Sequence, residues 1–169
     1  GFGHYAKLHT LQDLPSEDIL QVPFVNAAFW MIPIHVLQRV GGFCPLFYHY
    51  GEDKDFVNRL HYHQYQVGYS PQVFGNHDRE YRPLTHEGFL RTESVYHLSE
   101  YVNINHPWLK AFGYGVLAVM KKALTSLISG KFQLSKDYLR MGFQLLSRST
   151  EIQSYRKINR LSQPHYIQK

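Results

Sequence analysis

Three carboxylates stand within four positions of the chain, in the segment Gly51-Glu52-Asp53-Lys54-Asp55. A carboxylate within hydrogen-bond reach of a hydroxyl group can accept its proton, so such a segment can supply a general base. Carboxylates at the start of a helix also complement the positive end of the helix dipole, which is the purely structural interpretation of the same residues. The flanking residues therefore have to distinguish a catalytic role from a purely structural one.

Histidines are the second chemically active group, and the chain has eleven of them. Imidazole is an acceptable ligand for ions such as Mn²⁺. A lone histidine is also a common surface or capping residue. His61 and His63 point to different sides of a helix and do not share one metal ion. A metal-dependent hydrolase is disfavoured because no clustered motif such as His-Glu-x-x-His is present.

Short elements must position the carboxylates. The apolar run 22–34, with Pro23 and Pro33 near its ends, predicts a buried strand. A helix over 34–40 ends at Gly41-Gly42, which supply positive φ. The helix over 51–64 places Asp53 on the same face as its apolar residues. Short strands are predicted over 66–70 and 73–77.

The second half of the chain is predicted to be helical over 92–103, 107–129, 134–147 and 150–161, with Gly130 ending the second of these helices. The stretch from Phe112 to Ile128 is the most apolar. It is too short and, with Lys121 and Lys122, too charged to be predicted as a membrane span.

Composition fits a soluble globular protein, with 44% hydrophobic and 18% charged residues among 169. The net charge is +5, and the basic residues concentrate after position 120. No nucleic-acid-binding motif accompanies them, so a solvated or membrane-facing surface is favoured. Cys44 is the single cysteine and forms no internal disulfide, which favours a reducing compartment.

The segment from Val22 to Arg79 resembles the second half of the catalytic domain of family 2 glycosyltransferases. The resemblance rests on ordered pieces: Asn26-Ala27-Ala28-Phe29, then Arg39-Val40-Gly41-Gly42-Phe43, then Tyr50-Gly51-Glu52-Asp53-Lys54-Asp55, and finally His77. It implies an α/β fold, the C-terminal half of a GT-A-like domain with a mixed sheet, in residues 1–90. A helical C-terminal extension would follow in residues 91–169.

The resemblance also implies roles for individual residues. Asp53 matches the catalytic base of an inverting transfer, and Glu52 would orient the acceptor or the loop. Gly42 would allow close backbone approach to a substrate. Phe47, Tyr48 and Tyr50 would line the acceptor cleft by stacking on sugar rings. Trp30 would do the same, although a core position for Trp30 is an equal alternative. His77 would bind a divalent metal ion, Mg²⁺ or Mn²⁺.

The implied function is transfer from a nucleotide-diphosphate sugar to a saccharide or lipid-linked acceptor in bacterial cell-surface polysaccharide synthesis. It would take place in the cytoplasm, at the inner face of the membrane. The family holds the metal and donor with a separate Asp-x-Asp motif, and the single Asp-x-Asp here is Asp53-Lys54-Asp55. We therefore expect an acceptor-side fragment, inactive alone. Peripheral membrane association and self-association are further hypotheses, and a non-catalytic binding or scaffold module is the alternative function.

Overall fold

Helices dominate the described part of the chain, which in this computed structural model comprises residues 19–70, 72, 83 and 85–167. They account for 61% of these residues. Over the same ranges, the sheet consists of two short antiparallel strands, β1 (Leu20–Val22) and β2 (Val67–Tyr69), paired as Leu20 with Tyr69 and Val22 with Val67. The predicted α/β fold, a GT-A-like half domain with a mixed sheet, is therefore wrong.

The apolar run 22–34 explains most of this error. Only its first residue belongs to β1, and Pro23 then removes the backbone donor that the next ladder bond would need. The run is also poorly buried, since Phe29 is 68% and Met31 98% exposed. Apolar composition alone therefore does not make this run a buried strand. The predicted strand at 73–77 lies outside the described residues.

The two helices around the acidic segment are confirmed. Helix α2 spans Ile34–Val40 and ends at Gly41, whose φ is 84°. Helix α3 spans Glu52–Tyr62 and begins after Gly51, whose φ is 90°. L-residues with a side chain rarely adopt such φ values, so glycine is required at both ends of the intervening loop.

The helical second half is also confirmed, with an earlier start than predicted. Helix α4 spans His86–Val102 and is capped by Thr85, whose Oγ1 accepts a hydrogen bond from the Gly88 N–H (3.0 Å). The expected boundary between residues 90 and 91 therefore falls inside this helix. The remaining elements are α5 (Trp108–Phe112), the π-helical turn η2 (Gly113–Leu117), α6 (Ala118–Ile128), α7 (Phe132–Ser147) and α8 (Ser149–Asn159). Gly130, at φ 71°, lies between α6 and α7 as predicted.

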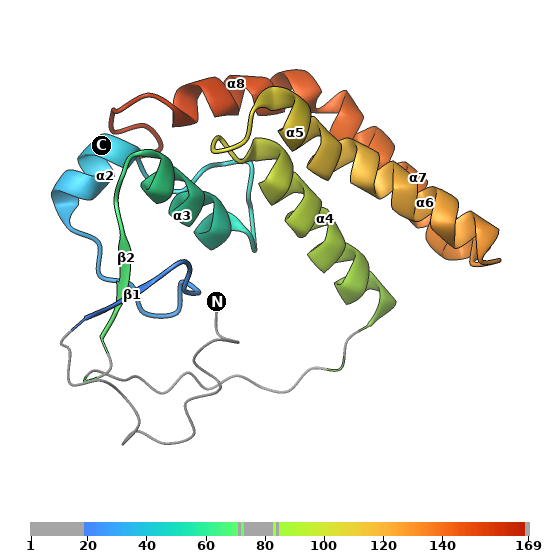
Figure 1. Ribbon diagram of the computed structural model, residues 1–169, viewed down its shortest axis with the longest axis horizontal. Coiled ribbons are helices and arrows are strands. Elements are labelled where there is room, and N and C mark those ends of the chain that lie inside the picture. The colour runs from blue at the N-terminus through green and yellow to red at the C-terminus, as the bar shows by residue number, and fades with distance from the viewer. Residues whose placement is uncertain (1–18, 71, 73–82, 84, 168–169) are drawn as a thin grey trace.

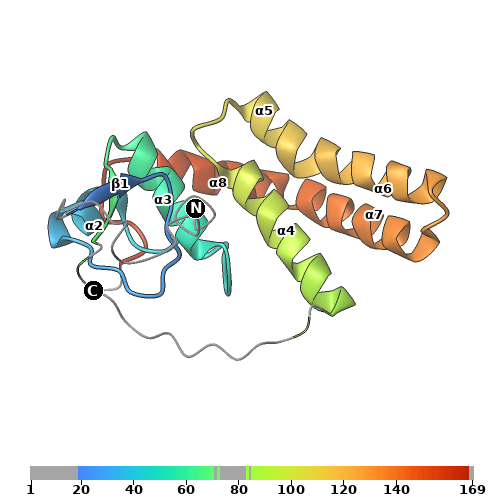
Figure 2. The same ribbon diagram turned by 60° about the horizontal axis from the view of Figure 1, so that its bottom comes forward.

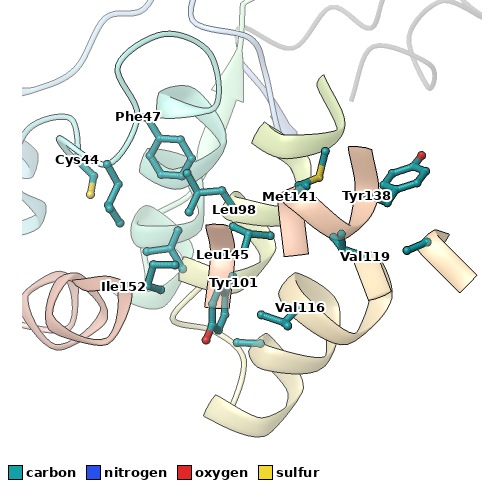
Figure 3. Close-up of a cluster of buried hydrophobic side chains, with 14 residues drawn as sticks. Cys44, Phe47, Leu98, Tyr101, Val116, Val119, Tyr138, Met141, Leu145 and Ile152 are labelled. Atoms are coloured by element: carbon teal, nitrogen blue, oxygen red, sulfur yellow. The ribbon is translucent and has the colours of Figure 1, made fainter. Parts of the chain in front are cut away.

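Two hydrophobic clusters hold these helices together. The smaller cluster packs α2 on α3 through Val36, Val40 and Phe56. The larger one joins Cys44, Leu46 and Phe47, from the loop before α3, to side chains of α4, α6, α7 and α8 (Figure 3). The loop that precedes the acidic segment is thus anchored in the core of the helical second half.

Figure 1 shows how the elements are placed. The sheet, α2 and α3 lie on one side, and α4 to α7 lie on the other. Helix α8 runs along the top of that view and returns the chain to α2, so the segment after α8 lies beside the loop between α2 and α3. Helices α6 and α7 run side by side as a hairpin in both views (Figure 2).

Candidate functional site

The site is built at the start of α3, where Gly51 sets the direction of the helix. A Cβ added to Gly51 would lie 2.7 Å from Val95 Cγ1 and 2.9 Å from Phe47 Cδ1. Space as well as φ therefore demands glycine there. Glu52, Asp53 and Asp55 follow in the first turn of the helix, where the helix dipole favours negative charge.

Asp53 is partly exposed, and its Oδ1 accepts a hydrogen bond from the Lys54 N–H at 2.7 Å. Lys54 directs its ammonium group to Glu100 instead, at 3.4 Å. Within the described residues no cation lies within ion-pair distance of the Asp53 carboxylate. Asp53 is therefore a carboxylate that a hydroxyl group can approach from solvent.

Glu52 is more buried than its place at a helix start requires. Its Oε2 is inaccessible to solvent and has no hydrogen-bond partner among the described residues. Buried acceptors of this kind are rare because their desolvation is not compensated. The Oε2 atom of Glu52 is therefore closed to solvent, whereas the Asp53 side chain is partly exposed.

Asp55 and Arg59 form a buried ion pair below the first turn. The Arg59 Nε donates to Asp55 Oδ2 at 2.8 Å, and both side chains are almost completely buried. The guanidinium also donates to the backbone oxygens of Val40 (2.8 Å) and Gly42 (2.7 Å). Burial raises the pKa of Asp55, and the charge of Arg59 opposes that shift. This pair ties the start of α3 to the Gly41-Gly42 turn.

The C-terminal segment covers the other side of that turn. The Gly42 N–H donates to the backbone oxygen of His165 at 2.8 Å. A Cβ on Gly41 would lie 2.5 Å from that oxygen, and a Cβ on Gly42 would lie 2.7 Å from the Tyr166 oxygen. The close approach that makes glycine necessary at position 42 is therefore to the chain's own backbone.

Side chains from this segment complete a buried polar cluster. The Tyr166 hydroxyl donates to Asn159 Oδ1 at 2.8 Å, and Asn159 Nδ2 lies 3.5 Å from Asp55 Oδ1. Burial raises the pKa of Cys44 to about 12. Burial, the Arg59 charge and His63 lower the pKa of His165 to about 4. The neutral forms of both side chains are therefore favoured at neutral pH.

The predicted sugar-stacking residues lie in different environments. Phe47 is buried in the larger cluster and so presents no ring face to solvent. Trp30 is partly buried, stacks on Phe43 with ring centroids 6.3 Å apart, and packs against the smaller cluster. Tyr48 is fully exposed and Tyr50 is 47% exposed. Tyr48 and Tyr50 are therefore exposed rings of this loop, as is Phe43, which is also 47% exposed.

The predicted metal ligand His77 lies outside the described residues. Within the described part of the chain, no group of three or more His, Cys, Asp and Glu side chains is placed to hold a metal ion.

Comparisons with protein-family models, with curated proteins and with solved structures find no match for this chain. The functional assignment therefore rests on the residues and their geometry.

Sequence reasoning missed the part of the site that comes from the far end of the chain. The spacing of Asp55 and Arg59, four positions apart on one helix, signals an ion pair. Nothing local signals that Asn159, His165 and Tyr166 return to the Gly41-Gly42 turn. That contact joins residues about a hundred positions apart, and it follows from the course of α8.

Proposed function

We propose that the chain carries the acceptor side of an inverting glycosyltransferase that uses a nucleotide-diphosphate sugar, with Asp53 as its base. The observation that carries the proposal is the partly exposed Asp53 carboxylate, free of ion pairs to described residues, at the start of a firmly anchored helix. The Arg59 hydrogen bonds support it, because they join the Gly-Gly-Phe and Glu-Asp-x-Asp pieces on which the resemblance rests.

The proposed transfer is a single displacement and forms no covalent intermediate with the protein. Asp53 accepts the proton of an acceptor hydroxyl as that oxygen attacks the anomeric carbon of the donor sugar. The new carbon–oxygen bond forms as the bond from the anomeric carbon to the diphosphate breaks, with inversion. The nucleoside diphosphate leaves with the bonding electron pair. Exposed Tyr48 and Tyr50 offer ring faces against which an acceptor sugar can stack.

The proposal gives these 169 residues the acceptor side alone, because their single Asp-x-Asp belongs to the base segment. Donor binding is assigned to a separate part of the enzyme. A saccharide or a lipid-linked saccharide is the proposed acceptor, and the cytoplasmic face of a membrane is the proposed location.

Replacing the base tests the proposal in a polypeptide that carries both the donor-binding part and these residues. Asp53→Asn keeps the shape of the side chain but removes the base, so kcat should fall about 10²–10⁴-fold. Glu87→Gln is the matched control, since Glu87 is a first-turn carboxylate of α4. Sugar transfer is measured with labelled donor, and circular dichroism checks folding. Undiminished transfer by Asp53→Asn would refute the base role, and turnover by the 169 residues alone would refute the acceptor-side assignment.

A non-catalytic binding module is the second candidate. It is favoured by one observation: the backbone of Gly41 and Gly42 is covered by the segment His165–Tyr166 rather than open to a substrate. A saccharide titration followed by NMR separates the two. If the chain is a binding module, Asp53→Asn should leave saccharide binding unchanged. The polypeptide that also carries the donor-binding part should then transfer no sugar.

A further inference from the structure

The α6–α7 hairpin has an apolar face that no described residue covers. Val119 and Ala123 of α6 are buried in the larger cluster, whereas Leu117 at the end of η2 and Leu124 of α6 are each 57% exposed. Ile128, the last residue of α6, is 78% exposed. The exposed residues recur at intervals of seven and four, so they form one stripe along the helix. The stripe lies on the side of α6 that points away from the core.

Helix α7 carries a matching stripe. Phe132 and Phe143 are 65% and 61% exposed, and Leu139 is also exposed. The two helices are held together by close contacts such as the Ser135 hydroxyl donating to the Ala123 oxygen at 2.9 Å. The two stripes therefore belong to one hairpin, whose helices run side by side (Figure 2).

Both stripes face away from α4. Glu93 of α4 accepts hydrogen bonds from Lys122 of α6 and from Tyr138 of α7, which marks the α4-facing side of each helix. At 100° per residue, Leu124 lies about 200° around α6 from Lys122. Phe143 lies about 140° around α7 from Tyr138. We call the combined surface the hairpin apolar face: Leu117, Leu124, Ile128, Phe132, Leu139 and Phe143.

Positive charge accompanies this face. Residues 103–147 contain six Lys or Arg and a single acidic residue, a net charge of +5. Lys121 lies in the α6 stripe between Leu117 and Leu124, and the exposed Lys136 and Arg140 flank the α7 stripe. The acidic residue, Asp137, is engaged by the His86 imidazole at 3.0 Å.

We propose that the hairpin apolar face docks on an anionic lipid surface, with its leucine and phenylalanine side chains in the interface and its cations on the headgroups. Apolar residues combined with Lys and Arg are the composition of helices that lie in a membrane interface. A second copy of the chain fits the face less well, since a symmetric contact would set Lys121, Lys136 and Arg140 against the same cations. The proposal does not depend on the proposed glycosyl transfer.

The geometry points to docking along the surface rather than insertion. The helix from Trp108 to Ile128 has 21 residues and is long and apolar enough to cross a membrane, but 33% of its most apolar window is buried inside the protein. Lys122 of the same helix binds Glu93 of α4, and Gly115 packs closely on Tyr101. Insertion would break these contacts, whereas docking keeps them.

Vesicle co-sedimentation of the 169-residue chain tests the proposal. Vesicles of phosphatidylcholine with about a quarter phosphatidylserine should bind it, and vesicles of phosphatidylcholine alone should bind it at least tenfold more weakly. The triple variant Lys121→Gln/Lys136→Gln/Arg140→Gln should lose about fivefold per cation, or roughly a hundredfold altogether. The double variant Leu124→Ser/Phe143→Ser should lose roughly tenfold per side chain.

Two substitutions away from the hairpin serve as matched controls. Met31→Ser removes an apolar side chain that is 98% exposed, and Lys157→Gln removes an exposed cation of α8. Both should bind vesicles like the wild type, and circular dichroism should show all variants folded.

Four results would overturn the proposal. The first is equal binding to vesicles with and without phosphatidylserine. The second is a loss of vesicle binding in the control variants as large as that in the hairpin variants. The third is a dimer in light scattering that Leu124→Ser/Phe143→Ser abolishes without any vesicle binding. Release from the vesicles by alkaline carbonate is expected, and resistance to it would indicate a membrane span instead.

Discussion

Arg59 is the residue that ties the start of α3 to the preceding loop. Its guanidinium satisfies the buried carboxylate of Asp55 and two backbone oxygens in the turn before α3. A buried ion pair stabilises little over an apolar replacement of the pair, but removal of one partner leaves a charge buried without compensation. Arg59 is therefore a positioning residue, which holds the helix that presents Asp53.

Arg59→Met should lower the free energy of unfolding by about 3–5 kcal/mol, because it leaves the buried Asp55 carboxylate and the oxygens of Val40 and Gly42 without a donor. Urea denaturation measures the loss. Arg91→Met is the matched control, since Arg91 pairs with Glu87 at the same spacing on an exposed helix surface, and it should cost at most about 1 kcal/mol. Equal losses in the two variants would contradict the positioning role.

At the scale of elements, the π-helical turn η2 shows how one helix is fitted to another. Gly115 packs against Tyr101 of α4, and a Cβ there would lie 2.5 Å from the Tyr101 Cβ. Gly113, in the same turn, has nothing within 4 Å of its added Cβ. The two glycines therefore have different reasons to be present.

Gly115→Ala should destabilise the protein by about 1–3 kcal/mol, because the close contact of η2 with α4 has to open. Gly113→Ala should be neutral or stabilising by about 0.4–1 kcal/mol, because alanine restricts the unfolded chain and fits the helix without strain. Thermal unfolding of the two variants is the measurement. A larger loss for Gly113→Ala than for Gly115→Ala would contradict the packing.

In the whole molecule, the C-terminal segment packs against the first helices and places the half-buried His165 beside the Gly41-Gly42 turn. Burial is the main cause of its lowered pKa of about 4 in the folded protein, against 6.5 for an ordinary histidine. Between pH 6.5 and 4 the unfolded chain therefore binds a proton that the folded protein does not. Stability rises with pH in this window and falls on acidification.

The pH dependence gives a prediction for the whole chain. On going from pH 7 to pH 4.5, the wild type should lose about 2–4 °C more in Tm than His165→Gln, or about 1 kcal/mol after allowance for partial exposure. His61→Gln, which changes an exposed histidine of α3, should keep the wild-type dependence. Calorimetry across this range checks both, and parallel pH profiles for His165→Gln and the wild type would contradict the assignment.

Local patterns were sufficient to predict most of the helices. The ends of α2 and α3 follow from Gly41 and Gly51, because positive φ is a property of the residue and its neighbours. The buried side of α7 also follows a local pattern, because Tyr138, Met141 and Leu145 recur at helical spacing. The Asp53 position in a first turn was likewise predictable from the chain alone.

Tertiary structure decided what these elements pack against. The run 22–34 has the composition of a buried strand, but burial depends on which other segments pack on it, and Met31 is 98% exposed. Phe47 was predicted to lie in a cleft and instead entered the core beside α4, because Gly51 turns the chain toward it. Asn159 lies beside Asp55, and Tyr166 bonds to Asn159, because α8 carries the chain back to the first helices. Sequence therefore determined the helices and their caps, which depend on near neighbours, and the fold alone determined the contacts between distant segments.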